Sequence, residues 1–245
     1  MFSRDAIKND FGRAAKTYGE MAVLQKTIRE EAIKLARDHF QKNAKILDLG
    51  CGSMPLEGGK NWDIIGADIA YGMCAVANGK GVKIINAAAT ALPLKDESVD
   101  GVFSSLMLQW VERPEAVIKE ILRVLKPDGV AVISTFVHGS LRELAAAFSA
   151  IDDIPHISDF ITSEQLLMRA AHAGAVVLEV RDETYEEEIE NAISLMKSIK
   201  QIGAANKNIN RKKGLMTKSQ LAKIAALYEG KIASWQVLTM VIGKA

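Results

Sequence analysis

The stretch Lys45-Ile-Leu-Asp-Leu-Gly-Cys-Gly52 decides the fold. It joins a short apolar run to two glycines that are separated by one residue. Glycine at the carboxyl end of a parallel strand permits a sharp turn and lets a ligand approach bare backbone. We therefore predict a strand over residues 45–49 and a ligand site beside Gly50 and Gly52.

Four further β-rich runs follow this strand, at residues 64–68, 82–85, 99–103 and 130–134. Helical or turn-rich segments separate them, and such alternation is typical of an α/β fold with a parallel sheet and helices on both faces. The helix predicted over residues 114–125 stops at Lys126-Pro-Asp-Gly129, because proline and glycine cannot continue it and favour a turn into the next strand.

The flanking regions are mostly helical. An amphipathic helix over residues 19–40 has Met21, Leu24, Ile28, Leu35 and Ala36 on one side and Lys26, Arg29, Glu30 and Arg37 elsewhere. Beyond residue 137 we predict helices at 140–150, 163–173, 189–202 and 217–228, and strands at 175–181 and 235–242. We expect a single domain over 1–245, with an N-terminal helical lid (1–43), a cofactor-binding core (44–136), a helical insertion (137–174) and C-terminal strands (175–245) that enclose a second helical insertion (187–230).

Bulk composition argues against several function classes. With 31 Lys and Arg against 30 Asp and Glu, the formal net charge is +1, so no global field attracts nucleic acid or a membrane. Cys51 and Cys74 follow no disulfide or metal spacing, and His138 and His156 have no second ligand pair, so we expect no metal. The absence of a long apolar run and the charged start of the sequence predict a cytoplasmic protein without a signal peptide.

A carboxylate ends the second predicted strand. Asp68 follows Gly50 by eighteen positions, where it can accept hydrogen bonds from both hydroxyls of a ribose. A dinucleotide fingerprint would need glycine at position 55, where Pro55 stands. Each feature alone also fits an ordinary tight turn or a helix cap, but their order at successive strand ends favours a nucleoside site.

The core resembles the class I S-adenosylmethionine methyltransferases. The resemblance spans about residues 44–136 and is carried by Ile46-Leu-Asp-Leu-Gly-Cys-Gly52, Asp68, Leu92-Pro93, Val99-Asp100 and Leu125-Lys-Pro-Asp-Gly129. It implies a Rossmann-like, mostly parallel seven-stranded sheet, S-adenosyl-L-methionine as cofactor and S-adenosyl-L-homocysteine as product. The cofactor-binding residues that it implies are Asp48, Gly50, Cys51, Gly52, Asp68, Ile69, Met73, Ala89, Leu92, Ser105 and Leu106.

Two departures from that family pattern stand out. Ser53-Met54 replaces a further glycine, and the span to Asp68 is short, so we expect a truncated first crossover helix. The family has an adenine-binding carboxylate four residues before Leu92, but this chain has Ala88 there. An acidic contact to the adenine amino group is therefore missing.

Segments outside the core are similar to the malonyl-acyl-carrier-protein O-methyltransferases of biotin synthesis. They are Phe11-Gly-Arg-Ala-Ala-Lys-Thr-Tyr18, Ala22, Gln25, Gln109-Trp110, Gly139-Ser-Leu141, Glu143-Leu144, Pro155-His156, Phe160, Met196 to Ala204 and Thr217-Lys-Ser-Gln-Leu221. The resemblance implies methylation of the free carboxylate of a malonyl thioester, carried by acyl carrier protein or coenzyme A. That carboxylate, with a pKa of about 4, is already ionised at neutral pH, so no general base is needed.

Four residues are candidates for catalysis or acceptor binding: Tyr18, Gln109, Trp110 and Lys200. Tyr18 and Trp110 can also be packing residues, and Lys200 can also be a solvated lysine. The basic segment 206–213 suits an acidic carrier protein or a solvated loop, and we expect the acidic run Glu186-Glu-Glu188 to face solvent.

Two other functions remain open from the sequence. Pro155-His-Ile-Ser158 and Gly203-Ala-Ala-Asn206 also resemble a hydroxylase-related assembly factor of respiratory complex I, which acts on a protein partner. A methyltransferase for a quinone or another small molecule is the third possibility, although no residue specifically supports it.

Overall fold

A seven-stranded sheet forms the centre of the molecule in the computed structural model, which describes residues 4–15, 23–57, 61–152, 156–201, 216–228 and 230–244. The strand order is β3-β2-β1-β4-β5-β7-β6. The strands are β1 (Lys45–Leu49), β2 (Asp63–Asp68), β3 (Lys83–Asn86), β4 (Val99–Ser105), β5 (Leu125–Phe136), β6 (Ala175–Glu188) and β7 (Ile232–Lys244). Neighbouring pairs are parallel from β3 to β5, and β7 is antiparallel to both β5 and β6. This arrangement confirms the predicted fold.

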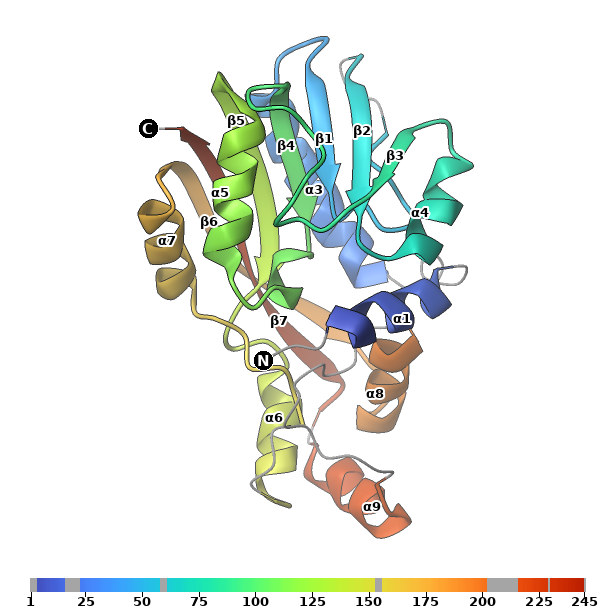
Figure 1. Cartoon of the computed structure of the whole chain (residues 1–245). Coiled ribbons are helices and arrows are strands. Elements are labelled where there is room, and N and C mark those ends of the chain that lie inside the picture. The colour runs from blue at the N-terminus through green and yellow to red at the C-terminus, as the bar shows by residue number, and fades with distance from the viewer. Residues whose placement is uncertain are drawn as a thin grey trace.

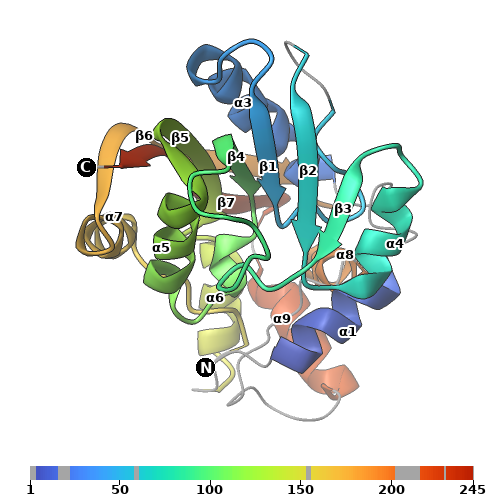
Figure 2. The ribbon, with the colours of Figure 1, turned by 45° about the horizontal axis from the view of Figure 1, so that its top comes forward.

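Helices cover both faces of the sheet (Figures 1 and 2). Helix α3 (Val23–His39) packs on one face against β4 and β5, while α5 (Pro114–Val124) and α7 (Ser163–His172) pack on the other. The remaining elements are α1 (Arg4–Ala14), α4 (Tyr71–Asn78), the 3-10 helix η1 (Leu108–Trp110), α6 (Arg142–Ser149), α8 (Ala192–Gln201) and α9 (Lys218–Leu227). None of the helices in the described part of the chain is long and apolar enough to cross a membrane.

The region between β1 and β2 contains no helix within its described residues, 50–57 and 61–62. In a doubly wound fold, a helix normally connects these strands and directs its N-terminus at the ligand. The described residues on either side of 58–60 form turns and irregular segments, in keeping with the short spacing. Ligand contacts at this edge must therefore come from the turn itself and from other elements.

The start of β5 differs from the predicted turn. Helix α5 ends at Val124, and β5 begins at once, with Leu125 paired to Val99. The pairing then shifts, because the next partners are Gly101 and Val130. Lys126-Pro-Asp128 are exposed and Gly129 is buried, and these four residues are therefore accommodated as an irregularity within the strand rather than as a separate loop.

Strand β6 is longer than predicted and carries the acidic run at its end. Its pairing with β7 continues as far as Glu188 and Ile232. Within this run, Glu187 accepts a hydrogen bond from Nε1 of Trp235 at 3.2 Å, and burial raises the pKa of the Glu187 carboxyl. The expectation that the whole run faces solvent was therefore wrong for Glu187, since the long antiparallel ladder turns it toward Trp235.

The last residues of β6 and the first residues of β7 support a second hydrophobic core. We call this core, together with helices α6, α8 and α9, the cap lobe. Figure 1 shows these helices gathered below the carboxyl edge of the parallel strands. Buried side chains from β7, α6, α8 and α9 meet others from α3 and β5 there, among them Leu24, Ile28, Phe136, Leu144, Leu195, Ile224 and Trp235, and β6 adds the partly buried Tyr185. The cap lobe thus lies beside the edge at which Gly50 and Gly52 turn the chain.

Candidate functional site

The turn after β1 requires both of its glycines. Gly50 has a φ angle of 74° and Gly52 a φ angle of 58°, in the left-handed region that side chains disfavour. A Cβ atom on Gly50 would lie 2.4 Å from Cγ of Met107, whereas one on Gly52 would meet nothing within 4 Å. The backbone N–H groups of Gly50 and Cys51 both donate to the carbonyl of Ala67, at 2.7 and 3.1 Å, which ties the turn to β2.

The buried side chain of Asp48 stabilises this turn. Its Oδ2 atom accepts hydrogen bonds from the backbone N–H of Leu56 at 2.6 Å and from the Arg29 guanidinium at 2.8 Å. Arg29 also lies over the ring of Phe103, 4.9 Å from its centroid. Asp48 is completely buried, and its Oδ1 atom has no hydrogen-bond partner among the described residues. Arg29, which the sequence places off the apolar side of its helix, nevertheless has a side chain that is only 14% exposed, because this buried carboxylate draws the guanidinium inward.

Asp68 connects the turn to the end of β2. Its Oδ2 atom accepts from the backbone N–H of Gly52 at 3.0 Å, and its Oδ1 atom accepts from Ala70 N–H at 2.7 Å. Burial raises the pKa of the Asp68 carboxyl, although these two backbone donors act in the opposite direction. Because a carboxylate oxygen can accept more than one hydrogen bond, both oxygens keep capacity for a ligand.

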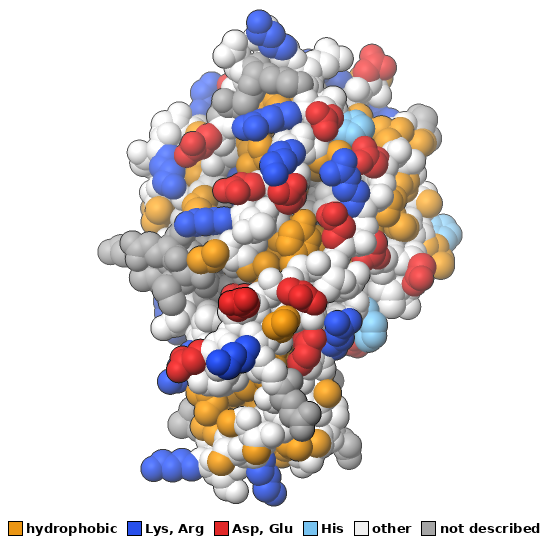
Figure 3. Space-filling model, turned by 180° about the vertical axis from the view of Figure 1, so that it is seen from behind, with side chains coloured by type: hydrophobic (Ala, Val, Ile, Leu, Met, Phe, Trp, Pro, Cys, Tyr) orange, Lys and Arg blue, Asp and Glu red, His pale blue; other side chains and the backbone are white. Residues whose placement is uncertain are grey.

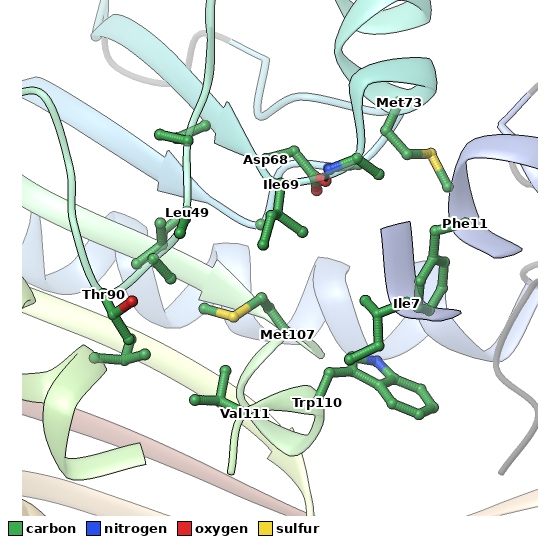
Figure 4. Close-up of a pocket in the computed structure, with 18 of the residues that line it drawn as sticks. Ile7, Phe11, Leu49, Asp68, Ile69, Met73, Thr90, Met107, Trp110 and Val111 are labelled. Carbon is green, nitrogen blue, oxygen red and sulfur yellow. Dashed lines mark hydrogen bonds between the residues drawn. The ribbon is translucent and has the colours of Figure 1, made fainter. Parts of the chain in front are cut away.

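A cavity of about 400 Å³, the first cavity, opens at this edge of the sheet (Figure 4). Its walls come from the ends of β1, β2 and β4, the segment after β3, and the start of α5. Helix α1 closes one side with Ile7 and Phe11, and the Phe11 ring meets the Trp110 ring edge-to-face at 5.5 Å. The residues in view are mostly apolar, with Asp68 at one side. Such a cavity suits a flat apolar ring linked to polar groups.

Most of the predicted cofactor residues line the first cavity: Gly50, Gly52, Asp68, Ile69, Met73, Ala89, Ser105 and Leu106. Asp48, Cys51 and Leu92 do not line it and are buried behind it. Cys51 is held in an apolar, acidic surrounding where burial raises the pKa of its thiol. Sequence reasoning missed Ile7, Met107, Val111, Glu112 and Arg113 as lining residues. Ile7, Met107 and Val111 are apolar and look like ordinary core residues in a sequence.

A second cavity of about 220 Å³ lies between the sheet and the cap lobe. Its lining is largely aromatic and aliphatic and includes Phe136, Leu144, Phe160, Ile199 and Trp235. Trp110 lines both cavities, so a ligand in one lies next to a ligand in the other. Lys200, an exposed residue of α8, is one of the residues that line the second cavity.

The other catalytic candidates occupy different positions. Gln109 is buried and lines neither of these cavities. Its Nε2 atom donates to the Leu106 carbonyl at 2.7 Å, and its Oε1 atom accepts from the Thr135 hydroxyl at 2.9 Å. Since Leu106 has a φ angle of 54°, Gln109 holds a strained turn in the wall of the first cavity. Tyr18 and residues 206–213 lie outside the described residues.

His156 takes part in a local side-chain pair. His156 lies 2.7 Å from Oδ1 of Asp152, and its ring stacks on Phe148 with centroids 4.2 Å apart. Across the described ranges, no group of three or more His, Cys, Asp and Glu side chains could hold a metal ion.

Comparisons with known proteins agree with this geometry. A family profile described as a methyltransferase domain matches residues 47–133. A chain from the complex of the Haloferax volcanii Trm112 methyltransferase activator with its methyltransferase has a TM-score of 0.61, 18% identity and 97% coverage of both chains. A possible histamine N-methyltransferase from Thermotoga maritima has a TM-score of 0.57 and 18% identity, covering 95% of this chain and 98% of its own. The fold and the site thus define a class I, S-adenosylmethionine-dependent methyltransferase.

Relatives with curated names indicate which family of methyltransferases the chain belongs to. A malonyl-[acyl-carrier protein] O-methyltransferase from Methylococcus capsulatus is 31% identical, over 96% of this chain and 91% of that protein. Another from Serratia marcescens is 32% identical, over 92% of this chain and 89% of that protein. The biotin biosynthesis bifunctional protein BioHC of Cellvibrio japonicus is 30% identical, over 97% of this chain and 50% of that protein. The chain belongs to the malonyl-[acyl-carrier protein] O-methyltransferase family.

Proposed function

We propose that the protein transfers a methyl group from S-adenosyl-L-methionine to the free carboxylate of malonyl-acyl-carrier protein, at an early step of biotin synthesis. The observation that carries this proposal is the pair of neighbouring cavities that share Trp110. Methyl transfer needs two ligands with their reacting atoms close together and shielded from water. The names of the curated relatives support the choice of acceptor and of pathway.

The residues of the first cavity fit S-adenosyl-L-methionine. Gly52 leaves open space where a side chain would stand, which allows backbone contact with the methionine part. Asp68 retains acceptor capacity for ribose hydroxyls, and the segment 87–90 offers an apolar wall to the adenine. When bound, the cofactor supplies an electrophilic methyl group on a sulfonium. The product, S-adenosyl-L-homocysteine, then occupies the same cavity.

The second cavity suits the malonyl group. Its apolar lining excludes water, and burying a carboxylate there requires a cationic or hydrogen-bonding partner. Among its lining residues Lys200 supplies an ammonium group, so we propose Lys200 as the partner of the acceptor carboxylate. The nucleophile is already ionised at neutral pH, so the protein's task is alignment, in which Trp110 forms the shared wall.

We also propose that the chain works as one cytoplasmic domain. In this proposal residues 1–43 act as a lid, residues 44–136 hold the cofactor, and the insertions 137–174 and 187–230 form the acceptor side. The packing of α1 beside the first cavity and of α6 and α8 around the second, with α9 in the same hydrophobic core, supports this division.

A direct assay tests the proposed function. Purified protein is incubated with S-adenosyl-L-methionine and malonyl-acyl-carrier protein, and the carrier is analysed by intact mass spectrometry. We expect a gain of one methyl group on the malonyl arm. Acetyl-acyl-carrier protein, which lacks the free carboxylate, is the matched control and should remain unchanged. Cofactor binding by calorimetry without methylation of the malonyl arm would contradict the proposed acceptor.

A further inference from the structure

The positive charge of this protein is concentrated in one part of the chain. Residues 191–228 contain eight Lys and Arg and no Asp or Glu, so the rest of the chain has 23 Lys and Arg against 30 Asp and Glu. The formal net charge of +1 therefore conceals a strongly basic segment, 191–228, which lies inside the insertion 187–230 and is flanked by Glu190 and Glu229. This insertion supplies helices α8 and α9 of the cap lobe.

Four lysines of this insertion lie in the described residues and form what we call the basic surface. Lys197 and Lys200 are on α8, Lys218 and Lys223 are on α9, and all four are exposed. Within the described residues, none of them forms an ion pair, whereas Lys34, Lys126 and Lys244 each pair with a carboxylate. Helices α8 and α9 pack against each other, so these charges share one region of the surface.

The surface view agrees with this segregation. In Figure 3 the lower end of the molecule, where α6 and α9 lie, shows basic side chains and no acidic ones, while the body above it carries both signs. Cations that have no carboxylate partner among the described residues repel each other, and their clustering is favourable only where a complementary partner binds or solvent screens them. Their clustering therefore indicates an anionic partner at this end.

The basic surface borders the second cavity. Helix α8 contributes Met196, Ile199 and Lys200 to the cavity wall, and Lys197 is three residues before Lys200 on the same helix. Side chains three residues apart lie on one face of a helix. A partner that contacts α8 and α9 is therefore positioned to deliver a flexible arm into the second cavity.

We propose that the basic surface is the docking site for an acidic face of the carrier protein that bears the malonyl group. This inference rests on the proposed function and adds the place where the carrier binds. A single phosphate would be bound by donors that converge on one point, but these lysines are spread over two helices, as an extended acidic surface requires. The acidic remainder of the chain disfavours a long polyanion such as nucleic acid.

Charge reversal with two acceptors tests the proposal. The variant Lys197→Glu/Lys218→Glu/Lys223→Glu leaves Lys200 in place, and its kcat/KM is measured with malonyl-acyl-carrier protein and with malonyl-pantetheine, which has no protein and no phosphate. Because complementary charge mainly accelerates encounter, we expect kcat/KM for the carrier to fall by about tenfold or more, through KM, and to become less sensitive to salt. The value for malonyl-pantetheine should stay within about twofold of the original, which also shows that the variant folds.

A matched control places the same charge change elsewhere. Lys80→Glu/Lys83→Glu/Lys119→Glu alters three exposed lysines outside the cap lobe and should leave kcat/KM for the carrier within about twofold. An unchanged KM for the carrier in the cap-lobe variant, or an equal loss in the control, overturns the docking site. An equal loss with malonyl-coenzyme A assigns the lysines to the phosphates of the arm and also overturns it. If the unaltered protein methylates neither acceptor, the proposed function fails instead, and the two failures are distinct.

Discussion

The guanidinium of Arg29 lies 2.8 Å from Oδ2 of Asp48, and this ion pair joins helix α3 to the turn that shapes the first cavity. The Asp48 side chain is fully shielded from solvent, and that of Arg29 is only 14% exposed. The ion pair therefore fixes the position of the turn after β1 relative to α3.

Removing Arg29 should destabilise the fold. Arg29→Met leaves the buried Asp48 carboxylate without its cation, and we expect the free energy of unfolding to fall by about 3–5 kcal/mol. Adding Asp48→Asn should recover part of this loss, because the uncompensated charge disappears. Arg13→Met, at an arginine whose side chain is 79% exposed, is the control and should cost less than about 1 kcal/mol. Urea unfolding measures all of these, and equal effects of Arg29→Met and Arg13→Met would contradict the assigned role.

The two glycines of the turn should respond differently to alanine. At Gly50 the new Cβ would collide with Met107, so Gly50→Ala should lower both stability and cofactor affinity. At Gly52 the Cβ has free space, so the stability cost should be limited to the left-handed backbone, about 1–2 kcal/mol. The new methyl group would still intrude on the first cavity and weaken cofactor binding. Thermal unfolding and calorimetry separate these effects, and the reverse order of stability would show that Met107 moves aside.

Asp68 should make cofactor binding depend on pH. Burial raises its pKa above the usual 3.8, so the carboxylate takes up a proton at a higher pH than an exposed aspartate does. The protonated form is favoured by the fold, which means that this group's contribution to stability is present at low pH and is lost as pH rises through the raised pKa. Affinity for S-adenosyl-L-methionine should therefore fall as pH is lowered through the same range. Asp68→Asn should bind weakly and without this pH dependence, as calorimetry across pH would show.

Ala88 offers a gain-of-function test. The resemblance to class I methyltransferases places a carboxylate at this position, and here Ala88 lines the first cavity without one. Ala88→Asp should supply an acceptor for the adenine amino group and tighten cofactor binding by on the order of tenfold, since a hydrogen bond to a charged group contributes about 1.5–3 kcal/mol. Ala88→Leu provides an apolar control that should not improve affinity. No gain with aspartate would indicate that the adenine lies elsewhere in the cavity.

Lys200 should act on the acceptor rather than on the cofactor. Lys200→Met removes the ammonium group from the wall of the second cavity and should lower kcat/KM for the malonyl acceptor by about tenfold to a hundredfold, because a buried carboxylate loses its partner. Lys200→Arg keeps the charge and should restore part of the activity. Calorimetry with S-adenosyl-L-methionine should give the same affinity for all three proteins, and a parallel loss of cofactor binding would refute the assignment.

Sequence reasoning found the strands of the core because their apolar runs are buried on both faces. The burial of Ile46 to Leu49 and of Ile64 to Ala67 shows the cause directly. The length of β6 could not be found this way, since its outer half is acidic and its extent is decided by pairing with β7. Local composition does not encode such a partner.

The candidate site was predictable where the backbone itself makes the site. Gly50, Gly52 and Asp68 follow from strand ends and turn geometry. The roles of Arg29 and Gln109 were not predictable, because their partners, Asp48 and Thr135, are distant in sequence and become neighbours only in the packed sheet. A polar residue beside a site motif suggests a catalytic role, but the Gln109 side chain instead supports the wall of the first cavity.

The first cavity is built by the sheet edge and the second mainly by the cap lobe, and Trp110 joins them. In the proposed assignment, donor recognition and acceptor recognition are therefore encoded by largely separate stretches of the chain. Substitutions in α6 or α8 should then redirect the enzyme to a different carboxylic acid while its use of the methyl donor persists, which makes the cap lobe the region in which to engineer new substrates.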